Sequence, residues 1–154
     1  MLNLFSQLAT LKTVIDEVQP LSTESWEDFS TLWKPFSAKR KEVLTVAGER
    51  ERYLYFVLEG VQRVYYFDDQ SREATLVFTY APSFGGVLDA LMLASPSRYY
   101  YETLTPSVFL RASITDLQPL IFYRFPLESR HVKYRSSHSQ FAEKSRALVQ
   151  SPLE

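Results

Sequence analysis

The 154-residue sequence contains no cysteine, so neither a disulfide framework nor a thiolate metal site is possible. No apolar run approaches the roughly 20 residues of a membrane-spanning helix, and the N-terminus lacks the basic region and cleavage site of a signal peptide. The formal net charge of −1 provides no overall attraction to nucleic acid or anionic lipid. These absences predict a cytoplasmic protein without membrane contact, in which DNA binding would need a local basic patch.

Glycine is also scarce, and all four glycines fall in the middle of the chain, at Gly48, Gly60, Gly85 and Gly86. A chain so poor in glycine keeps it where the backbone needs a positive φ or a close approach, so we expect tightly specified turns at these positions. Hydrophobic residues, by contrast, make up 45% of the chain and aromatic residues 15%. This composition predicts one domain with a substantial core and a flanking helical element.

The pattern of apolar residues changes from helical to strand-like near Phe36. Before it, the spacing predicts a helix over 2–18, which ends before Pro20, and a second helix that starts at Ser22 and ends at Pro35. After it come short β-branched and aromatic runs separated by turn residues. The predicted strands are 41–46, 53–59, 61–67, 74–80, 99–104 and 108–112. Short strands at this spacing are typical of a sandwich or barrel.

The last third of the sequence returns to a helical pattern. Ser113 can cap a short helix over 114–117, and a longer helix is expected over 126–150. In this longer segment apolar residues recur every seven positions, with histidines four residues after two of them, which is the a/d spacing of a seam between two helices. We expect a homodimer whose interface consists of Leu127, His131, Tyr134, His138, Phe141 and Leu148. The same side chains could instead pack on the protein's own sheets.

These elements predict a domain over 1–125, a dimerisation helix over 126–150 and the start of a further element at 151–154. In the last segment a serine followed by proline is typical of a helix start. The chain is therefore expected to be either the sensor portion of a longer protein or a stand-alone sensor.

Four short motifs resemble a known family. They are Gly48 after a strand, the run Tyr-Phe-Val-Leu-Glu-Gly-Val-Gln-Arg-Val over 55–64, the pair Phe84-Gly85, and Pro96-Ser97-Arg98 before Leu104-Thr105. With the order of elements, they resemble the sensor half of the Crp/Fnr family of bacterial transcription regulators, a cyclic-nucleotide-binding domain. The resemblance implies a mainly β fold: a double-stranded β-helix (jelly roll or β-roll) with flanking N-terminal helices and a long C-terminal helix.

The resemblance also implies a binding site of known chemistry. In that family a phosphate-binding cassette presents backbone amides at a short helix, a carboxylate near the ribose hydroxyl, and an arginine against the cyclic phosphate. The ligand implied is a cyclic nucleotide such as cAMP. The residues expected to contact it are Phe84, Gly85, Gly86, Val87, Leu88, Asp89, Ser97, Arg98, Tyr99 and Tyr100.

Two positions depart from the family pattern. Gly86 replaces the cassette glutamate, for which Asp89 is the nearest substitute. Ser97 replaces the arginine that follows the proline, and Arg98 comes one residue later, on the opposite face of an extended strand. A serine offers one neutral donor in place of a two-pronged guanidinium, which argues against cAMP itself. Arg98 could equally be a surface side chain, and aromatic rings could fill the roll.

No catalytic motif has supporting context: a Ser-His-Asp set, HExxH, a P-loop and paired catalytic carboxylates are all missing, so we expect no enzyme. His131 and His138 lack an Asp or Cys to complete a metal site, and we expect no metal. The main prediction is a ligand-sensing regulatory domain that binds a small-molecule effector in its β-roll and signals through the C-terminal helix. The alternative is a degenerate roll that serves as a dimerisation or protein-interaction module. DNA is expected as a partner only if a helix-turn-helix domain follows.

Overall fold

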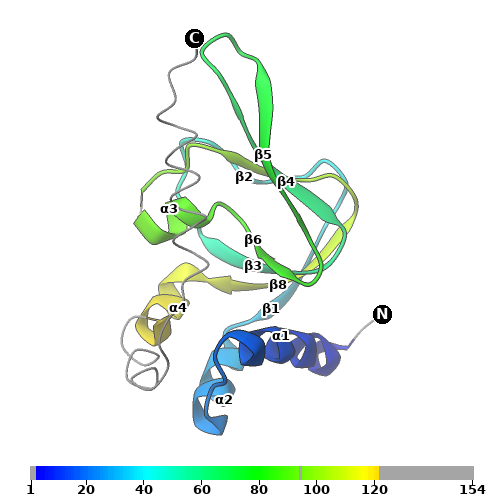
Figure 1. Ribbon diagram of the computed structural model, residues 1–154, viewed down its shortest axis with the longest axis vertical. Helices are drawn as coiled ribbons and strands as arrows, with labels where there is room; N and C mark the ends of the chain where they lie inside the picture. Colours follow the sequence, from blue (N-terminus) through cyan, green and yellow to red (C-terminus); the bar gives the residue numbers. More distant parts are fainter. Residues whose placement is uncertain (1–2, 94, 122–154) are drawn as a thin grey trace.

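The computed structural model describes residues 3–93 and 95–121 of the chain. It contains two four-stranded antiparallel sheets, with strand orders β1-β8-β3-β6 and β2-β7-β4-β5 (Figure 1). The strands are β1 (Lys34–Ala38), β2 (Val43–Thr45), β3 (Tyr53–Glu59), β4 (Val61–Phe67), β5 (Glu73–Tyr80), β6 (Ser83–Gly85), β7 (Tyr100–Thr103) and β8 (Ser107–Ser113). The helices are α1 (Leu4–Val18), α2 (Thr23–Thr31), α3 (Leu88–Leu93) and α4 (Ile114–Pro119).

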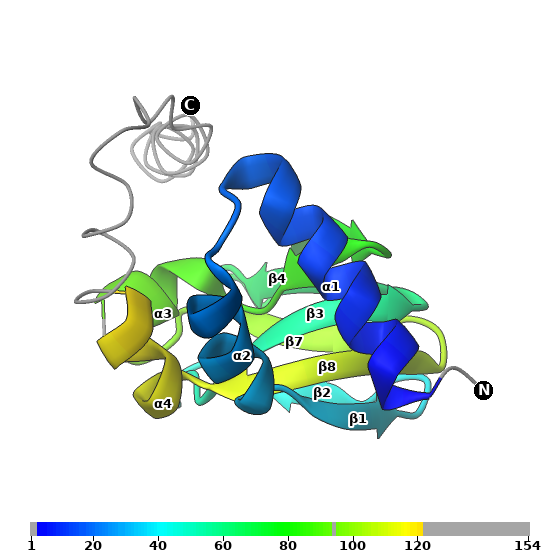
Figure 2. The ribbon, with the colours of Figure 1, turned by 90° about the horizontal axis from the view of Figure 1, so that it is seen from below.

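The sheet that contains β3 and β8 is buried on both of its faces, which explains why β3 is a nearly continuous hydrophobic run. Successive side chains of a strand point to opposite faces. Tyr55 and Val57 therefore lie in the cluster of the roll interior, whereas Phe56 lies in a second cluster with Leu11 and Phe29 of the N-terminal helices. Figure 2 shows α1 and α2 lying over this sheet.

Trp33 joins the N-terminal helices to the roll. It is almost fully buried, and its ring centroid lies 5.6 Å from that of Phe29 on α2 and 6.0 Å from that of Phe84 on β6. The helices begin at the expected polar caps: the Asn3 side chain accepts a hydrogen bond from the Ser6 amide, and that of Ser22 accepts one from the Ser25 amide. Local capping and a shared aromatic core therefore fix the helices on the sheet.

Gly60 forms the tight turn between β3 and β4 that the sequence predicts. Its φ is +90°, a conformation that side chains disfavour, and a Cβ atom there would collide with the Ser107 hydroxyl and the Pro106 carbonyl. Glycine is thus required both for the backbone conformation and for the close approach of the loop before β8.

The mainly β roll with flanking N-terminal helices is confirmed, but several predicted boundaries are wrong. The second helix ends at Thr31, and Lys34–Ala38 forms β1 instead. Pro35 is tolerated because β1 is an edge strand. Strand β6 was not predicted, and the strand expected over 41–46 shortens to β2. Ser113 does precede α4, but its side chain makes no capping hydrogen bond.

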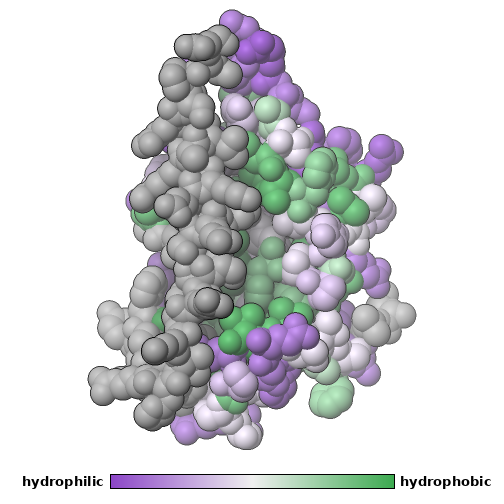
Figure 3. Space-filling view, in the orientation of Figure 1, coloured by the Kyte–Doolittle hydropathy of each residue, from purple (hydrophilic) through white to green (hydrophobic). Residues whose placement is uncertain are grey.

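The described surface is not uniformly polar. Figure 3 shows hydrophobic residues gathered on part of one face. The exposed large hydrophobic residues of the described chain include Phe67, Leu76 and Phe78 of the β4–β5 hairpin.

Among the described residues, no helix is both long and apolar enough to cross a membrane. The predicted C-terminal helix and all six predicted dimer-interface residues lie outside the described residues.

Candidate functional site

The predicted cassette runs from β6 through α3 to β7, and its first half lies against the interior of the roll. Phe84 faces away from the interior and packs on Phe56, with ring centroids 5.2 Å apart. Gly85, Gly86 and Val87 are buried, and Leu88 is half-buried at the start of α3. The backbone of Asp89 lies in α3, but its side chain is outside the described part of the structure.

In the second half of the cassette, Ser97 is buried and Arg98 is exposed. The Ser97 hydroxyl donates to the Tyr99 carbonyl over 2.7 Å and accepts from the Tyr99 amide over 3.1 Å. The Ser97 carbonyl also accepts a hydrogen bond from the amide of Gly48, in the loop before β3. The hydroxyl and backbone of Ser97 are therefore used in hydrogen bonds that stabilise the local turn, while Arg98 lies at the surface.

The three consecutive tyrosines take different places. Tyr99 is half-buried and packs against the interior cluster, and Tyr100 stacks on Tyr65 with centroids 5.1 Å apart. Tyr101 is fully buried inside the roll, with its centroid 5.7 Å from that of Tyr55. An aromatic ring therefore occupies the space beside the cassette.

The Tyr101 hydroxyl meets the cassette backbone directly. A Cβ atom on Gly85 would collide with this hydroxyl, so only glycine allows the approach. The Gly86 amide donates to the hydroxyl oxygen, which also forms a 3.1 Å hydrogen bond with the Thr79 hydroxyl. Burial raises the pKa of Tyr101 above its ordinary value, and these two hydrogen bonds offset only part of that effect.

Glu51 supplies a second internal oxygen to the cassette, and sequence reasoning missed it. Its Oε2 atom accepts a 2.6 Å hydrogen bond from the Thr45 hydroxyl and a 3.2 Å hydrogen bond from the Val87 amide. Burial raises the pKa of Glu51, although these hydrogen bonds act in the opposite direction. The backbone amides of Gly86 and Val87 thus both point at oxygen atoms that belong to the protein itself.

Replacing Glu51 by glutamine is expected to change how stability depends on pH. Because the folded-state pKa is raised, the native state binds a proton more readily than the unfolded state, and the stability of the wild type falls as pH rises from about 4.5 through the folded pKa. The amide oxygen of E51Q can still accept both hydrogen bonds, so the substitution should cost no more than about 1 kcal/mol in acid. Urea unfolding across this pH range should show the variant gaining stability relative to the wild type as pH rises.

Glu49→Gln is the matched control for this experiment, because Glu49 is an exposed carboxylate of the same loop. Its difference from the wild type should stay flat over the same pH range. A flat difference for Glu51→Gln as well would show that Glu51 is not buried against the cassette.

Two hollows lie beside Tyr53 and Arg111 in the described part of the molecule. None of the predicted ligand-binding residues lines either of them. The first has a volume of about 300 Å³, and its wall includes Thr45, Glu51, Tyr55 and Arg111. The second has a volume of about 400 Å³ and shares Arg111 with the first. Among the described residues, no group of three His, Asp or Glu side chains is placed to hold a metal ion. His131 and His138 lie outside this part of the chain.

Comparison with known proteins places the chain in a family. Residues 35–123 match the cyclic nucleotide-binding domain family. No curated protein sequence is significantly similar to the chain. Several solved structures share the fold at low sequence identity.

The sensor domain of the transcriptional regulator DNR from Pseudomonas aeruginosa is 16% identical with a TM-score of 0.66, and the match covers 95% of this chain and 89% of that domain. The Thermus thermophilus catabolite activator protein is 18% identical with a TM-score of 0.62, over 85% of this chain and 57% of that one. A guanosine-bound regulatory subunit of a cAMP-independent protein kinase A from Trypanosoma cruzi is 12% identical with a TM-score of 0.66, over 94% of this chain and 52% of that one.

The chain thus spans little more than half the length of the latter two proteins. Identities this low establish a shared fold and nothing more. The family match itself extends over more than half of the sequence. The chain therefore belongs to the cyclic nucleotide-binding domain family.

Proposed function

We propose that this chain is a non-catalytic regulatory domain of the Crp/Fnr type, which senses a small molecule in its β-roll and transmits occupancy through the segment 126–150. The observation that carries the proposal is the pair of inward-facing amides of Gly86 and Val87. Each is held by an oxygen atom, one from the Tyr101 hydroxyl and one from the Glu51 carboxylate. A ligand that offers oxygen atoms of its own can replace them, and its differential contacts would favour one arrangement of the domain over another.

The known relatives support a regulatory role for this fold. Of the similar structures, one is the sensor domain of a transcriptional regulator, one is a catabolite activator protein, and one is a kinase regulatory subunit with bound guanosine. If this chain is regulatory in the same way, another domain or a partner protein responds to the ligand bound in the roll. DNA is then contacted only if a helix-turn-helix domain follows the sensor. A homodimer through residues 126–150 remains part of this proposal.

The chemistry of the cassette argues against cAMP in the manner of the family. The buried hydroxyl of Ser97 is already bonded to the Tyr99 backbone, and Arg98 is exposed. A cyclic phosphate beside the Gly86 and Val87 amides would therefore meet no guanidinium of the cassette. We expect the effector to be a smaller molecule than cAMP or one that does not depend on an arginine clamp.

The second candidate function is a closed roll that acts only through protein contacts. The fully buried Tyr101 favours it, because the ring and hydroxyl already fill the space beside Gly85. In that case the domain has no effector, and its exposed surfaces carry its function.

Thermal unfolding of the whole chain with cAMP, cGMP and guanosine separates the two candidates. A ligand present at 100 times its dissociation constant stabilises the native state by about 2.7 kcal/mol. The sensor proposal expects at least one compound to give a saturable increase in midpoint and expects cAMP to give none. A result with no increase for any compound would support the closed roll.

Glu51→Ala tests whether a bound ligand contacts the cassette. The substitution frees the Val87 amide from its internal acceptor, so any ligand that binds that amide should bind the variant more tightly than the wild type. Glu49→Ala, in the same loop but exposed, should leave the affinity unchanged. Equal affinities in all three proteins would mean that the ligand does not use the cassette.

A further inference from the structure

We propose that the hollow of about 300 Å³ beside Arg111 binds a small organic oxyanion, a carboxylate or a phosphate ester, at a site separate from the cassette. Arg111 lies on β8, where its Cα is paired with those of Lys34 on β1 and Tyr55 on β3. Its side chain lines the hollow together with residues from β1, β2 and β3. The site is therefore built on the sheet and not on a surface loop alone.

The guanidinium of Arg111 is held in place by stacking. Its central carbon lies 4.0 Å from the ring centroid of Phe36 and 4.4 Å from that of Tyr53. Stacking uses the faces of the guanidinium and leaves the N–H donors at its edges. One edge lies beside the Tyr55 hydroxyl. An arginine fixed in this way is pre-organised to bind two oxygen atoms of an anion at little cost in side-chain entropy.

Arg111 also forms no ion pair with any carboxylate of the described residues. Over residues 3–93 and 95–121, ion pairs are formed by the basic side chains of Lys12, Lys41, Arg63 and Arg72, but no carboxylate oxygen lies within ion-pair distance of Arg111. The same is true of Arg50 and Arg52, which line the same hollow. Three arginines thus line the hollow, and within the part of the chain that the structure describes none of them forms an ion pair.

Three glutamates also line the hollow, but two of them are engaged elsewhere. Glu42 accepts a hydrogen bond from the Lys39 amide over 2.8 Å, and Glu51 faces Thr45 and Val87. The third, Glu49, is exposed. The positive charge of Arg111 is therefore uncompensated at the inner wall of the hollow, while the outer rim carries charges of both signs.

The size and the remaining wall define the class of ligand. A volume of about 300 Å³ is at the lower end of small-molecule pockets, so the ligand is compact. Phe36 and Leu44 offer an apolar surface to its carbon skeleton, and Arg111 receives its charged group. None of the predicted ligand-binding residues of the cassette lines the hollow, although Glu51, which accepts from the Val87 amide, lies in its wall.

Thermal unfolding of the whole chain in sodium succinate, sodium phosphate and sodium chloride at equal ionic strength tests the proposal. Succinate or phosphate should raise the midpoint above its value in chloride in a saturable manner, and the stronger of the two identifies carboxylate or phosphate as the preferred group. Arg111→Gln should weaken this binding at least about tenfold, because a charge-assisted pair of hydrogen bonds is lost. Arg40→Gln, at an exposed arginine that does not line the hollow, should bind as the wild type does.

Arg111→Lys provides a second test in case Arg111→Gln does not fold. It keeps the charge but loses the two-pronged geometry, so it should fold and bind several-fold more weakly than the wild type. Equal anion-dependent shifts in the wild type and in Arg111→Gln would mean an adventitious ion only and would overturn the proposal. An absence of any specific shift in the wild type would overturn it as well.

Discussion

Tyr101→Ala is expected to lower the free energy of unfolding by about 3–5 kcal/mol, which is the usual cost of truncating a buried aromatic side chain. Tyr101 is fully buried, its ring contacts Tyr55, and its hydroxyl is bonded to Thr79 and Gly86. Truncation leaves a cavity beside Gly85 that the flanking strands cannot close without moving the cassette. Guanidinium unfolding followed by circular dichroism measures the loss.

Tyr101→Phe is the matched control, because it keeps the ring and removes only the hydroxyl. Thr79 retains its hydrogen bond to the Gln62 side chain, but the buried Gly86 amide loses its acceptor, so the cost should be about 1–3 kcal/mol. A loss below about 1 kcal/mol for the alanine variant would show that the ring does not fill the interior. Ligand screening of the same two variants adds a functional measure, because only the alanine variant opens space for an effector.

The strand pattern of the roll could be predicted from sequence because its strands obey local rules. The turn from β3 to β4, which connects the two sheets, is the clearest case: a hydrophobic run, a glycine that must adopt a positive φ, and a second run. By contrast, the sequence pattern does not predict β1, because Pro35 marks the end of the second helix and residues 36–38 are too few to indicate a strand by themselves. Only pairing with β8, more than 60 residues away in sequence, makes Lys34–Ala38 a strand.

The polar groups at the cassette could not be predicted in the same way. Glu51 lies in the run Glu-Arg-Glu-Arg over 49–52, which is typical of a solvated loop. Its burial depends on the Val87 amide, 36 residues later in the chain. Arg111 likewise gains its significance from Phe36 and Tyr53, which two other strands bring to it. The ligand contacts predicted from the family resemblance stay predictions.

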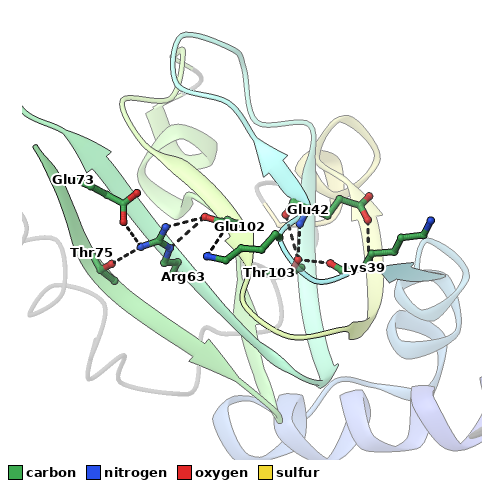
Figure 4. A network of polar contacts seen from close by, with 8 residues as sticks. Lys39, Glu42, Arg63, Glu73, Thr75, Glu102 and Thr103 are labelled. Atoms are coloured by element: carbon green, nitrogen blue, oxygen red, sulfur yellow. Dashed lines mark hydrogen bonds and ion pairs between the residues drawn. The ribbon is translucent and has the colours of Figure 1, made fainter. Parts of the chain in front are cut away.

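Arg63 on β4 and Glu102 on β7 form the centre of a buried ion-pair network on the β2-β7-β4-β5 sheet (Figure 4). The side chains of Arg63 and Glu102 are only 13% and 7% exposed, and their Nη2 and Oε2 atoms are 3.0 Å apart. Lys41 approaches the other Glu102 oxygen at 3.2 Å, and Glu73 pairs with the opposite edge of the guanidinium. Burial acts to raise the pKa of Glu102, but the hydrogen bonds from Arg63 and Lys41 outweigh it and hold the pKa below its ordinary value.

Arg63→Met should therefore cost about 3 kcal/mol at neutral pH, because it leaves the Glu102 carboxylate buried with only the half-exposed Lys41 as partner. A lowered pKa stabilises the native state above the ordinary carboxyl range and loses that effect as pH falls through the folded pKa. The gap between wild type and variant should accordingly narrow in acid, as measured by urea unfolding at several pH values. Glu73→Gln, which removes a more exposed partner of the same guanidinium, should cost less than about 1 kcal/mol. Equal small losses for both variants would contradict a buried network, since the Glu102 charge would then be solvated without Arg63.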